Sequence, residues 1–198
     1  TKFLNIKISV NGKLPKLPSL IVSNHVSWLD IIVIGHLVPT VFLSKKEVKR
    51  WPILGLLTKL AGTIFINRGN GQSEKIKKSM IDKFSKNYSV TIFPEGTTSD
   101  GKNVKSFFPR LYAAAIEKNI PVVPVSIYYH VGGYIDEGLP FIGEQKFLEN
   151  FFTIVKRPRS EVKINFFDGI KPDNIDRKSL AKKTHSIILN SIDELKRL

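Results

Sequence analysis

Short apolar runs rich in β-branched residues alternate along the chain with segments of helical periodicity. Six runs predict β-strands, several of them apolar on both faces, at residues 20–23, 41–44, 63–66, 90–93, 122–129 and 162–167. Helical spacing of apolar residues, or a high alanine content, predicts helices at residues 73–87, 110–118 and 179–198. This alternation is typical of an α/β domain with a mostly parallel sheet flanked by helices. We expect one such domain over residues 1–198, with its core at about 20–170.

The composition excludes several kinds of site. The chain has 198 residues and no cysteine, which excludes a disulfide scaffold, a thiolate metal site and a cysteine nucleophile. Its four histidines are scattered, and no two of them have the spacing of metal ligands, so we expect no metal. The hydrophobic share of 42% is enough to bury a core.

Positive charge is concentrated in the first half of the chain. Residues 1–99 carry 15 basic and 5 acidic side chains, whereas residues 100–198 carry 16 and 12, and the formal net charge is +14. A basic surface predicts an anionic partner, which leaves nucleic acid, a phosphorylated metabolite and an acidic membrane surface open.

Residues 51–66 form an apolar stretch with one charge, Lys59, directly after a basic cluster. This pattern suits an element at an anionic lipid surface, and it also suits a buried helix that runs into a core strand. The residues that would contact the membrane are Lys45, Lys46, Lys49, Arg50 and Trp51. No apolar run reaches 18 residues, so we expect no transmembrane helix, and the first residues lack a signal-peptide layout.

The most informative segment is SNHVSWLD at residues 23–30, a predicted turn from a strand into a helix. The five-residue spacing of His25 and Asp30 turns through roughly 500° on a helix, so they meet only if His25 precedes the helix and folds back. Asp30 then accepts the imidazole N–H and leaves the other ring nitrogen as a general base. A Ser-x-x-Asp capping signature, with Ser27 at the cap and Asp30 in the first turn, supports that geometry. Alternatively, Asp30 only caps the helix.

Two further segments follow predicted strands, where ligands bind in this architecture. FPEGTTSDG at residues 93–101 either presents the carboxylate of Glu95 or forms an ordinary turn. In FINRGNG at 65–71, Arg68 could clamp a phosphate with paired hydrogen bonds. A dinucleotide loop is excluded there, because Glu74 occupies the third glycine position.

Together these segments resemble the glycerophospholipid acyltransferase superfamily, the 1-acylglycerol-3-phosphate acyltransferases and their relatives. An Asn-His-x4-Asp motif begins at Asn24, and a Lys/Glu–Pro–Gly lead-in over residues 46–62 precedes a strand that ends in Arg68. Phe-Pro-Glu-Gly-Thr occupies residues 93–97, and a Val-Pro-Val strand occupies residues 123–126. Four motifs in the family's order, over about residues 21–127, carry the resemblance.

The resemblance implies acyl transfer from acyl-CoA or acyl-carrier protein to the free hydroxyl of a lysophospholipid, most simply 1-acylglycerol-3-phosphate, giving phosphatidic acid. His25 would be the general base and Asp30 its orienting partner, with no cofactor beyond the thioester. The substrate-binding residues would be Asn24, Arg68, Glu95, Gly96, Thr97, Thr98 and Arg110. The enzyme would be bacterial and lie at the cytoplasmic face of the inner membrane, peripherally or through an anchor upstream of Thr1.

Two departures from the family pattern affect the acceptor. Thr98 replaces an arginine that usually helps to bind glycerol phosphate, and Phe108 replaces a lysine. Arg110 could restore one cation, and a lyso-ornithine lipid or another lysophospholipid would need fewer cations than a free phosphomonoester. The motifs from 97 to 110 and from 139 to 143 resemble a bacterial branch with less uniform acceptors.

Other classes of function stay open at this point. A hydrolase could use Ser23 or Ser27 beside His25, although the Gly-x-Ser-x-Gly elbow is missing. A basic nucleic-acid-binding module would fit the charge, but most phenylalanines lie in apolar runs rather than among basic residues, so no specific nucleic acid is expected. A non-catalytic lipid-binding relative is the third alternative.

Overall fold

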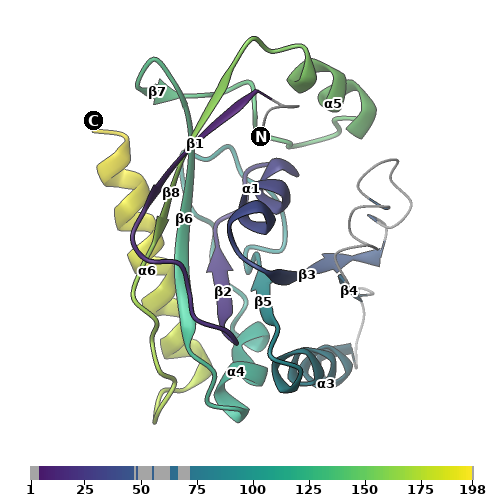
Figure 1. The fold of residues 1–198 in the computed structure, drawn as a ribbon, viewed down its shortest axis with the longest axis vertical. Coiled ribbons are helices and arrows are strands. Elements are labelled where there is room, and N and C mark those ends of the chain that lie inside the picture. The colour runs from purple at the N-terminus through teal and green to yellow at the C-terminus, as the bar shows by residue number, and fades with distance from the viewer. Residues whose placement is uncertain (1–4, 47, 49–54, 56–62, 67–71, 198) are drawn as a thin grey trace.

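The computed structural model describes residues 5–46, 48, 55, 63–66 and 72–197. Its strands form one eight-stranded sheet in the order β1-β8-β6-β2-β5-β3-β4, with β7 paired to β6 (Figure 1). The strands are β1 (Ile6–Asn11), β2 (Leu20–Ser23), β3 (Thr40–Lys45), β4 (Ile64–Ile66), β5 (Ser89–Ile92), β6 (Val122–Val131), β7 (Tyr134–Ile135) and β8 (Ser160–Phe166). Only the pairs of β6 with β7 and β8 are antiparallel among the described strands, so the mostly parallel sheet is confirmed.

The described helices include every predicted one. They are α1 (Leu29–Leu37), α3 (Gln72–Ser85), α4 (Ala113–Glu117), α5 (Phe147–Val155) and α6 (Arg177–Leu195), with a 3₁₀ turn η3 (Pro109–Tyr112) before α4. The strands β1 and β7 and the helix α5 were not predicted from the sequence. β1 is an edge strand in which only Ile6 is buried, so its apolar face is short and its pattern is weak.

Two apolar cores cover the two faces of the sheet. Strand β2 supplies both, because successive side chains point to opposite faces: Ile21 lies in one core, and Leu20 and Val22 lie in the other. Helices α1 and α5 pack in the first core, and α3, α4 and α6 pack in the second. Figure 1 shows α6 along β6, on the side of the sheet away from α1.

The topology brings two of the motif-bearing loops together. β2 pairs parallel with both β5 and β6, so the segments after β2 and β5 leave the same edge of the sheet. One direct link between them is the hydrogen bond from the Ser99 N–H to the His25 carbonyl, at 2.7 Å. The fold therefore places 24–30 beside 93–99, although about 70 residues separate them in sequence.

Candidate active site

The His25 and Asp30 side chains meet as the spacing predicts. His25 Nδ1 lies 2.7 Å from Asp30 Oδ2, and the Asp30 side chain is 0% exposed while that of His25 is 18% exposed. The same Oδ2 accepts the main-chain N–H groups of Val26 at 2.7 Å and Ser27 at 3.0 Å. The two interpretations of Asp30 are thus not exclusive, because one oxygen both fixes the turn and orients the imidazole.

The prediction that the Ser27 side chain caps the helix is wrong. Helix α1 begins one residue later than a Ser27 cap requires, with Trp28 at the N-cap position and no side-chain cap bond. The Ser27 hydroxyl is buried and has no hydrogen-bond partner among the described atoms. Only the acidic half of the signature forms, in which Asp30 reaches back to the main chain.

Tyr129 is a site residue that the sequence analysis missed. Its hydroxyl donates to Asp30 Oδ1 at 2.7 Å, across 99 residues of sequence. Burial and the neighbouring Asp30 carboxylate hold the pKa of Tyr129 well above its ordinary value, so the hydroxyl stays a donor. A buried tyrosine in an otherwise apolar strand needs a partner for its hydroxyl, and that was the available signal.

Asn24, predicted to bind substrate, is instead committed to the sheet. Its side-chain amide donates to the Ile127 carbonyl at 2.9 Å and accepts from the Ile127 N–H at 2.8 Å. The residue is buried and does not line the cavity described below. We therefore reassign Asn24 to fixing the His25 turn against β6.

Glu95 also serves His25 rather than an open subsite. One carboxylate oxygen accepts the His25 main-chain N–H at 2.7 Å, and the other accepts the Lys105 N–H at 2.9 Å. Burial raises the pKa of Glu95, and the two N–H bonds oppose that shift. We predicted that Glu95 holds an acceptor head group; because both its oxygens are bonded to main chain, we reassign it to positioning His25.

The His25 ring forms part of the wall of a cavity of about 1270 Å³. The ring stacks on Phe93 with centroids 4.0 Å apart. Because Nδ1 is bonded to Asp30, Nε2 is the ring nitrogen that is left for a substrate. Among the described residues, the lining includes Trp28, Ile31, Leu43, Ile66, Gly96, Thr97, Thr98, Asp100, Lys105, Phe108, Arg110 and Phe141. The lining is therefore mainly apolar with a few charged groups, as a site for a lipid chain and a polar head would be.

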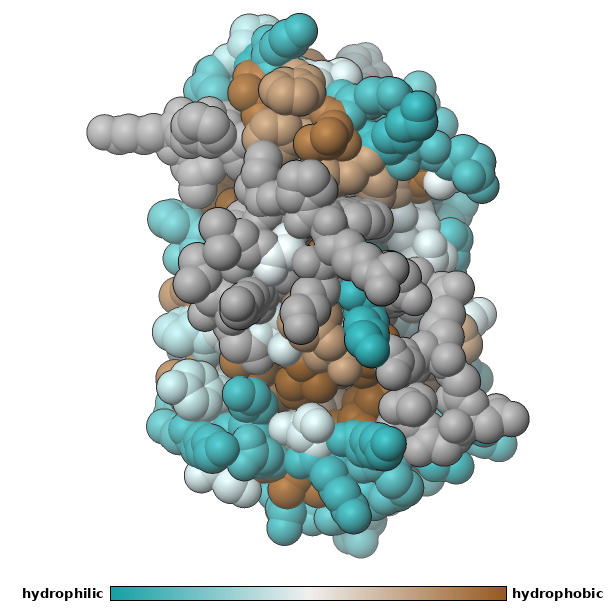
Figure 2. Space-filling model, turned by 90° about the vertical axis from the view of Figure 1, so that its right-hand side faces the viewer, coloured by the Kyte–Doolittle hydropathy of each residue, from teal (hydrophilic) through white to brown (hydrophobic). Residues whose placement is uncertain are grey.

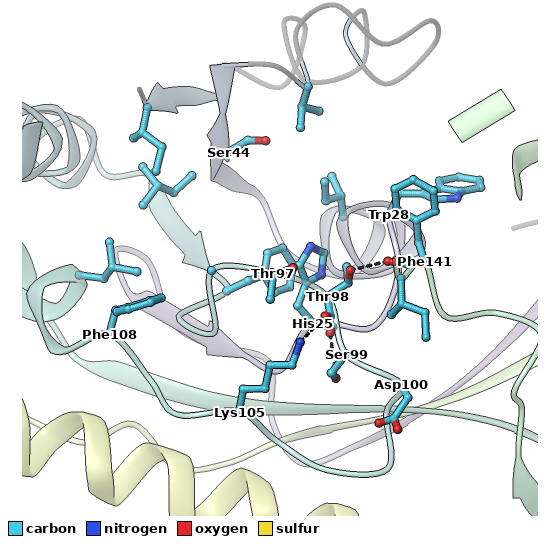
Figure 3. A pocket seen from close by; sticks show the side chains of 18 of the residues that line it. His25, Trp28, Ser44, Thr97, Thr98, Ser99, Asp100, Lys105, Phe108 and Phe141 are labelled. Carbon is cyan, nitrogen blue, oxygen red and sulfur yellow. Dashed lines mark hydrogen bonds between the residues drawn. The ribbon is translucent and has the colours of Figure 1, made fainter. Parts of the chain in front are cut away.

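Gly96, Thr97, Thr98 and Arg110 thus reach the predicted site. Gly96 has φ +69, and a Cβ there would lie 2.7 Å from the Phe108 ring, so the loop needs glycine. Figure 3 shows Lys105 reaching toward the loop of Thr98, whose carbonyl accepts from Lys105 Nζ at 2.9 Å. Lys105 is a cavity cation that the motif comparison missed, because it matches no motif position.

Some predicted site residues lie outside the described residues, namely Arg68, Lys49, Arg50 and Trp51. Lys45 is the last residue of β3, and Lys46 is exposed just after it. No group of three or more His, Cys, Asp or Glu in the described part of the chain could hold a metal ion. Likewise, none of the helices described is long and apolar enough to cross a bilayer.

A family model described as Acyltransferase matches residues 5–128. This chain belongs to the acyltransferase family. It is 38% identical over 93% of its length to a lyso-ornithine lipid O-acyltransferase of Pseudomonas aeruginosa, of which it covers 72%. It is 33% identical over 82% of its length to a 1-acyl-sn-glycerol-3-phosphate acyltransferase of Neisseria gonorrhoeae, of which it covers 65%.

Structural similarity agrees with the family membership. The crystal structure of the 1-acyl-sn-glycerophosphate acyltransferase PlsC from Thermotoga maritima matches with a TM-score of 0.73 at 21% identity. The match covers 98% of this chain and 74% of that one. The acyltransferase fold therefore extends beyond the motif region to nearly the whole chain.

Removing the Glu95 carboxylate should destabilise the site loops. Glu95→Ala leaves the His25 and Lys105 N–H groups without their acceptor, so we expect the free energy of unfolding to fall by about 1.5–3 kcal/mol in urea titrations. The control, Glu144→Ala, removes an exposed carboxylate and should stay within about 0.5 kcal/mol of the parent. Equal effects of the two substitutions would contradict the positioning role of Glu95.

Proposed function

We propose that this chain is the catalytic domain of an O-acyltransferase that transfers a fatty acyl group from a thioester to the free hydroxyl of a lysolipid. The observation that carries the proposal is the pair formed by His25 and the fully buried Asp30 at the wall of a largely apolar cavity. A histidine held at Nδ1 by a carboxylate is a general base at Nε2. Family membership supplies the reaction class.

In the proposed reaction, the lysolipid hydroxyl oxygen attacks the thioester carbonyl carbon while His25 Nε2 takes the hydroxyl proton. The positive charge of the imidazolium is stabilised by Asp30 Oδ2 at 2.7 Å. The tetrahedral intermediate then expels the thiolate, which receives the proton back from His25. Atoms and charge balance without an acyl-enzyme, and acyl-CoA or acyl-carrier protein serves as co-substrate with no further cofactor.

A lyso-ornithine lipid is the acceptor that the observations favour. The described charged groups that line the cavity beside His25 are Lys105, Arg110 and Asp100. Two cations and one carboxylate suit a zwitterionic head group, which carries an ammonium as well as a carboxylate, better than a phosphomonoester dianion. The Pseudomonas relative, named for lyso-ornithine lipid, matches more of this chain than the Neisseria relative does.

Arg68 and the loop of Gly96, Thr97 and Thr98 would contact the acceptor head group in this proposal. The enzyme would work peripherally at an anionic membrane, at the cytoplasmic face where thioester donors are found. The excess of 31 basic over 17 acidic residues supports attraction to such a surface. It would equally attract nucleic acid without sequence preference, which is not proposed as a function.

The central assay measures thiol release from palmitoyl-CoA in the presence of lyso-ornithine lipid. Because the chain has no cysteine, a thiol reagent reads only the released CoA. We expect release to depend on acceptor, and Asp30→Asn and His25→Ala to lower turnover by about 10²–10⁴ while both proteins stay folded. The control is His36→Ala, an exposed histidine in the last turn of α1, which should keep parent activity. Full turnover by folded His25→Ala would refute the base assignment, and release without acceptor would indicate a hydrolase.

The acceptor assignment is tested by comparing two lysolipids. The value of kcat/KM for lyso-ornithine lipid should exceed that for 1-acylglycerol-3-phosphate by about tenfold, the effect of roughly 1.4 kcal/mol of charge mismatch. Asp100→Asn should lower the value for lyso-ornithine lipid alone, because only that acceptor carries an ammonium. If the parent protein prefers 1-acylglycerol-3-phosphate, the acceptor assignment is wrong, and the product of the enzyme is phosphatidic acid.

A further inference from the structure

Helix α5 carries exposed apolar side chains that its packing does not require. Leu148 and Phe152 are 45% and 55% exposed and lie four residues apart, one above the other on the same side of the helix. On the opposite side, Phe147 and Ile154 are buried in the core that α1 shares. Figure 2 shows the apolar patch near the top of the molecule, over α5, with hydrophilic residues above it and to its right.

This patch adjoins the cavity that contains His25. The segment directly before α5 lines the cavity, and it includes Ile142, which is 40% exposed. The helix is also tied to the catalytic turn, since Trp28 Nε1 donates to Asn150 Oδ1 at 2.8 Å and the Trp28 ring lies 5.7 Å from that of Phe151. Whatever α5 contacts is therefore held beside the mouth of the site.

The charges around the patch are those of a surface that meets anions. Of the four basic side chains in residues 144–159, Arg157 pairs with Asp136 and Arg159 pairs with Glu161, so the cations of this segment that are left to face solvent are Lys146 and Lys156. Lys146 and Lys156 lie at the two ends of α5 and are exposed, and Glu149 lies 3.6 Å from Lys146. An apolar stripe with lysines at its ends is typical of helices that lie in a membrane interface, because the stems of the lysines stay apolar while the ammonium groups reach the head groups.

We propose that Ile142, Leu148 and Phe152 form a bilayer-contact surface that inserts into the head-group region of an anionic membrane and places the cavity mouth against the lipid. The inference rests on the proposed function. A lysolipid acceptor is dissolved in the bilayer, and it reaches the cavity without passing through water only if the cavity mouth lies against the membrane. It adds a second contact surface to the one predicted at residues 45–51. The exposed side of α5 is convex and offers no groove for a partner protein to fill. Fluid lipid can adapt to a convex surface, so lipid is the favoured partner.

A single fluorescent label tests the contact directly. The chain has no cysteine, so Phe152→Cys can be labelled uniquely with a polarity-sensitive dye. The matched control is Tyr88→Cys, which replaces a 50% exposed aromatic side chain just before β5, at the sheet edge opposite the site. Vesicles of phosphatidylcholine and phosphatidylglycerol should shift the emission to the blue at position 152 and leave position 88 unchanged. The shift should be smaller with phosphatidylcholine alone.

Several outcomes of the label experiment would contradict the proposal that α5 contacts the bilayer. These are an unchanged spectrum at position 152, equal shifts at the two positions, or a response at 152 to acyl-carrier protein but not to vesicles. The last outcome would make α5 a protein-docking site instead. Each is read without turnover, so it holds for a protein of any activity.

The double variant Leu148→Gln/Phe152→Gln links the surface to function. Glutamine keeps helix propensity, and we expect vesicle partition to fall by about tenfold or more because both side chains lose their apolar transfer energy. Turnover of acceptor in vesicles should fall in parallel, whereas turnover of acceptor dispersed in detergent should stay at the parent level. If the folded, active double variant binds vesicles as well as the parent protein does, the proposed bilayer-contact surface is wrong and the proposed function is unaffected. Tight binding through α5 by a parent protein that lacks all transferase activity overturns the proposed function alone.

Discussion

The site depends on one buried charge. The Asp30 carboxylate has no exposed surface, and a carboxylate without water is stable only if hydrogen-bond donors replace its hydration. Four groups do so: the imidazole of His25, the main-chain N–H groups of residues 26 and 27, and the Tyr129 hydroxyl. These donors belong to the turn after β2 and to β6, so the pairing of β2 with β6 is what assembles them. The same arrangement stabilises positive charge on His25.

A second carboxylate fixes the backbone that carries this histidine. Glu95 comes from the loop after β5, the other neighbour of β2, and it accepts the His25 N–H, while Ser99 of that loop donates to the His25 carbonyl. The His25 side chain is therefore held by Asp30, from the turn after β2. Its main chain is held by the loop after β5. A base fixed in this way loses little entropy when the acceptor hydroxyl arrives, which is how preorganised sites lower activation barriers.

Features controlled by local spacing could be predicted from the sequence, whereas features that depend on contacts between distant segments could not. Five residues of spacing and a strand-to-helix turn allowed His25 to meet Asp30, and the Asn-His-x4-Asp motif favoured that pairing over a capping role alone. The Tyr129 and Asn24 contacts join the turn after β2 to β6, about 100 residues away, so no local pattern indicated which residues would be their partners. Glu95 was found as a site residue, but its role depends on which N–H groups face it. Helix α5 was missed although its pattern is strongly amphipathic, because it spans only nine residues and is rich in phenylalanine and β-branched residues, which also favour strands.

The most direct measurement of the central claim is the tautomer of His25, read from the ¹⁵N chemical shifts and proton couplings of its ring by NMR and assigned with a His25→Gln sample. We expect a proton on Nδ1, in a hydrogen bond to Asp30, and no proton on Nε2. Asp30→Asn should remove that preference, because the amide no longer requires a donor. A proton on Nε2 in the parent protein at neutral pH would contradict the role of His25 as general base. A protonated Nε2 cannot take up the proton of the lysolipid hydroxyl.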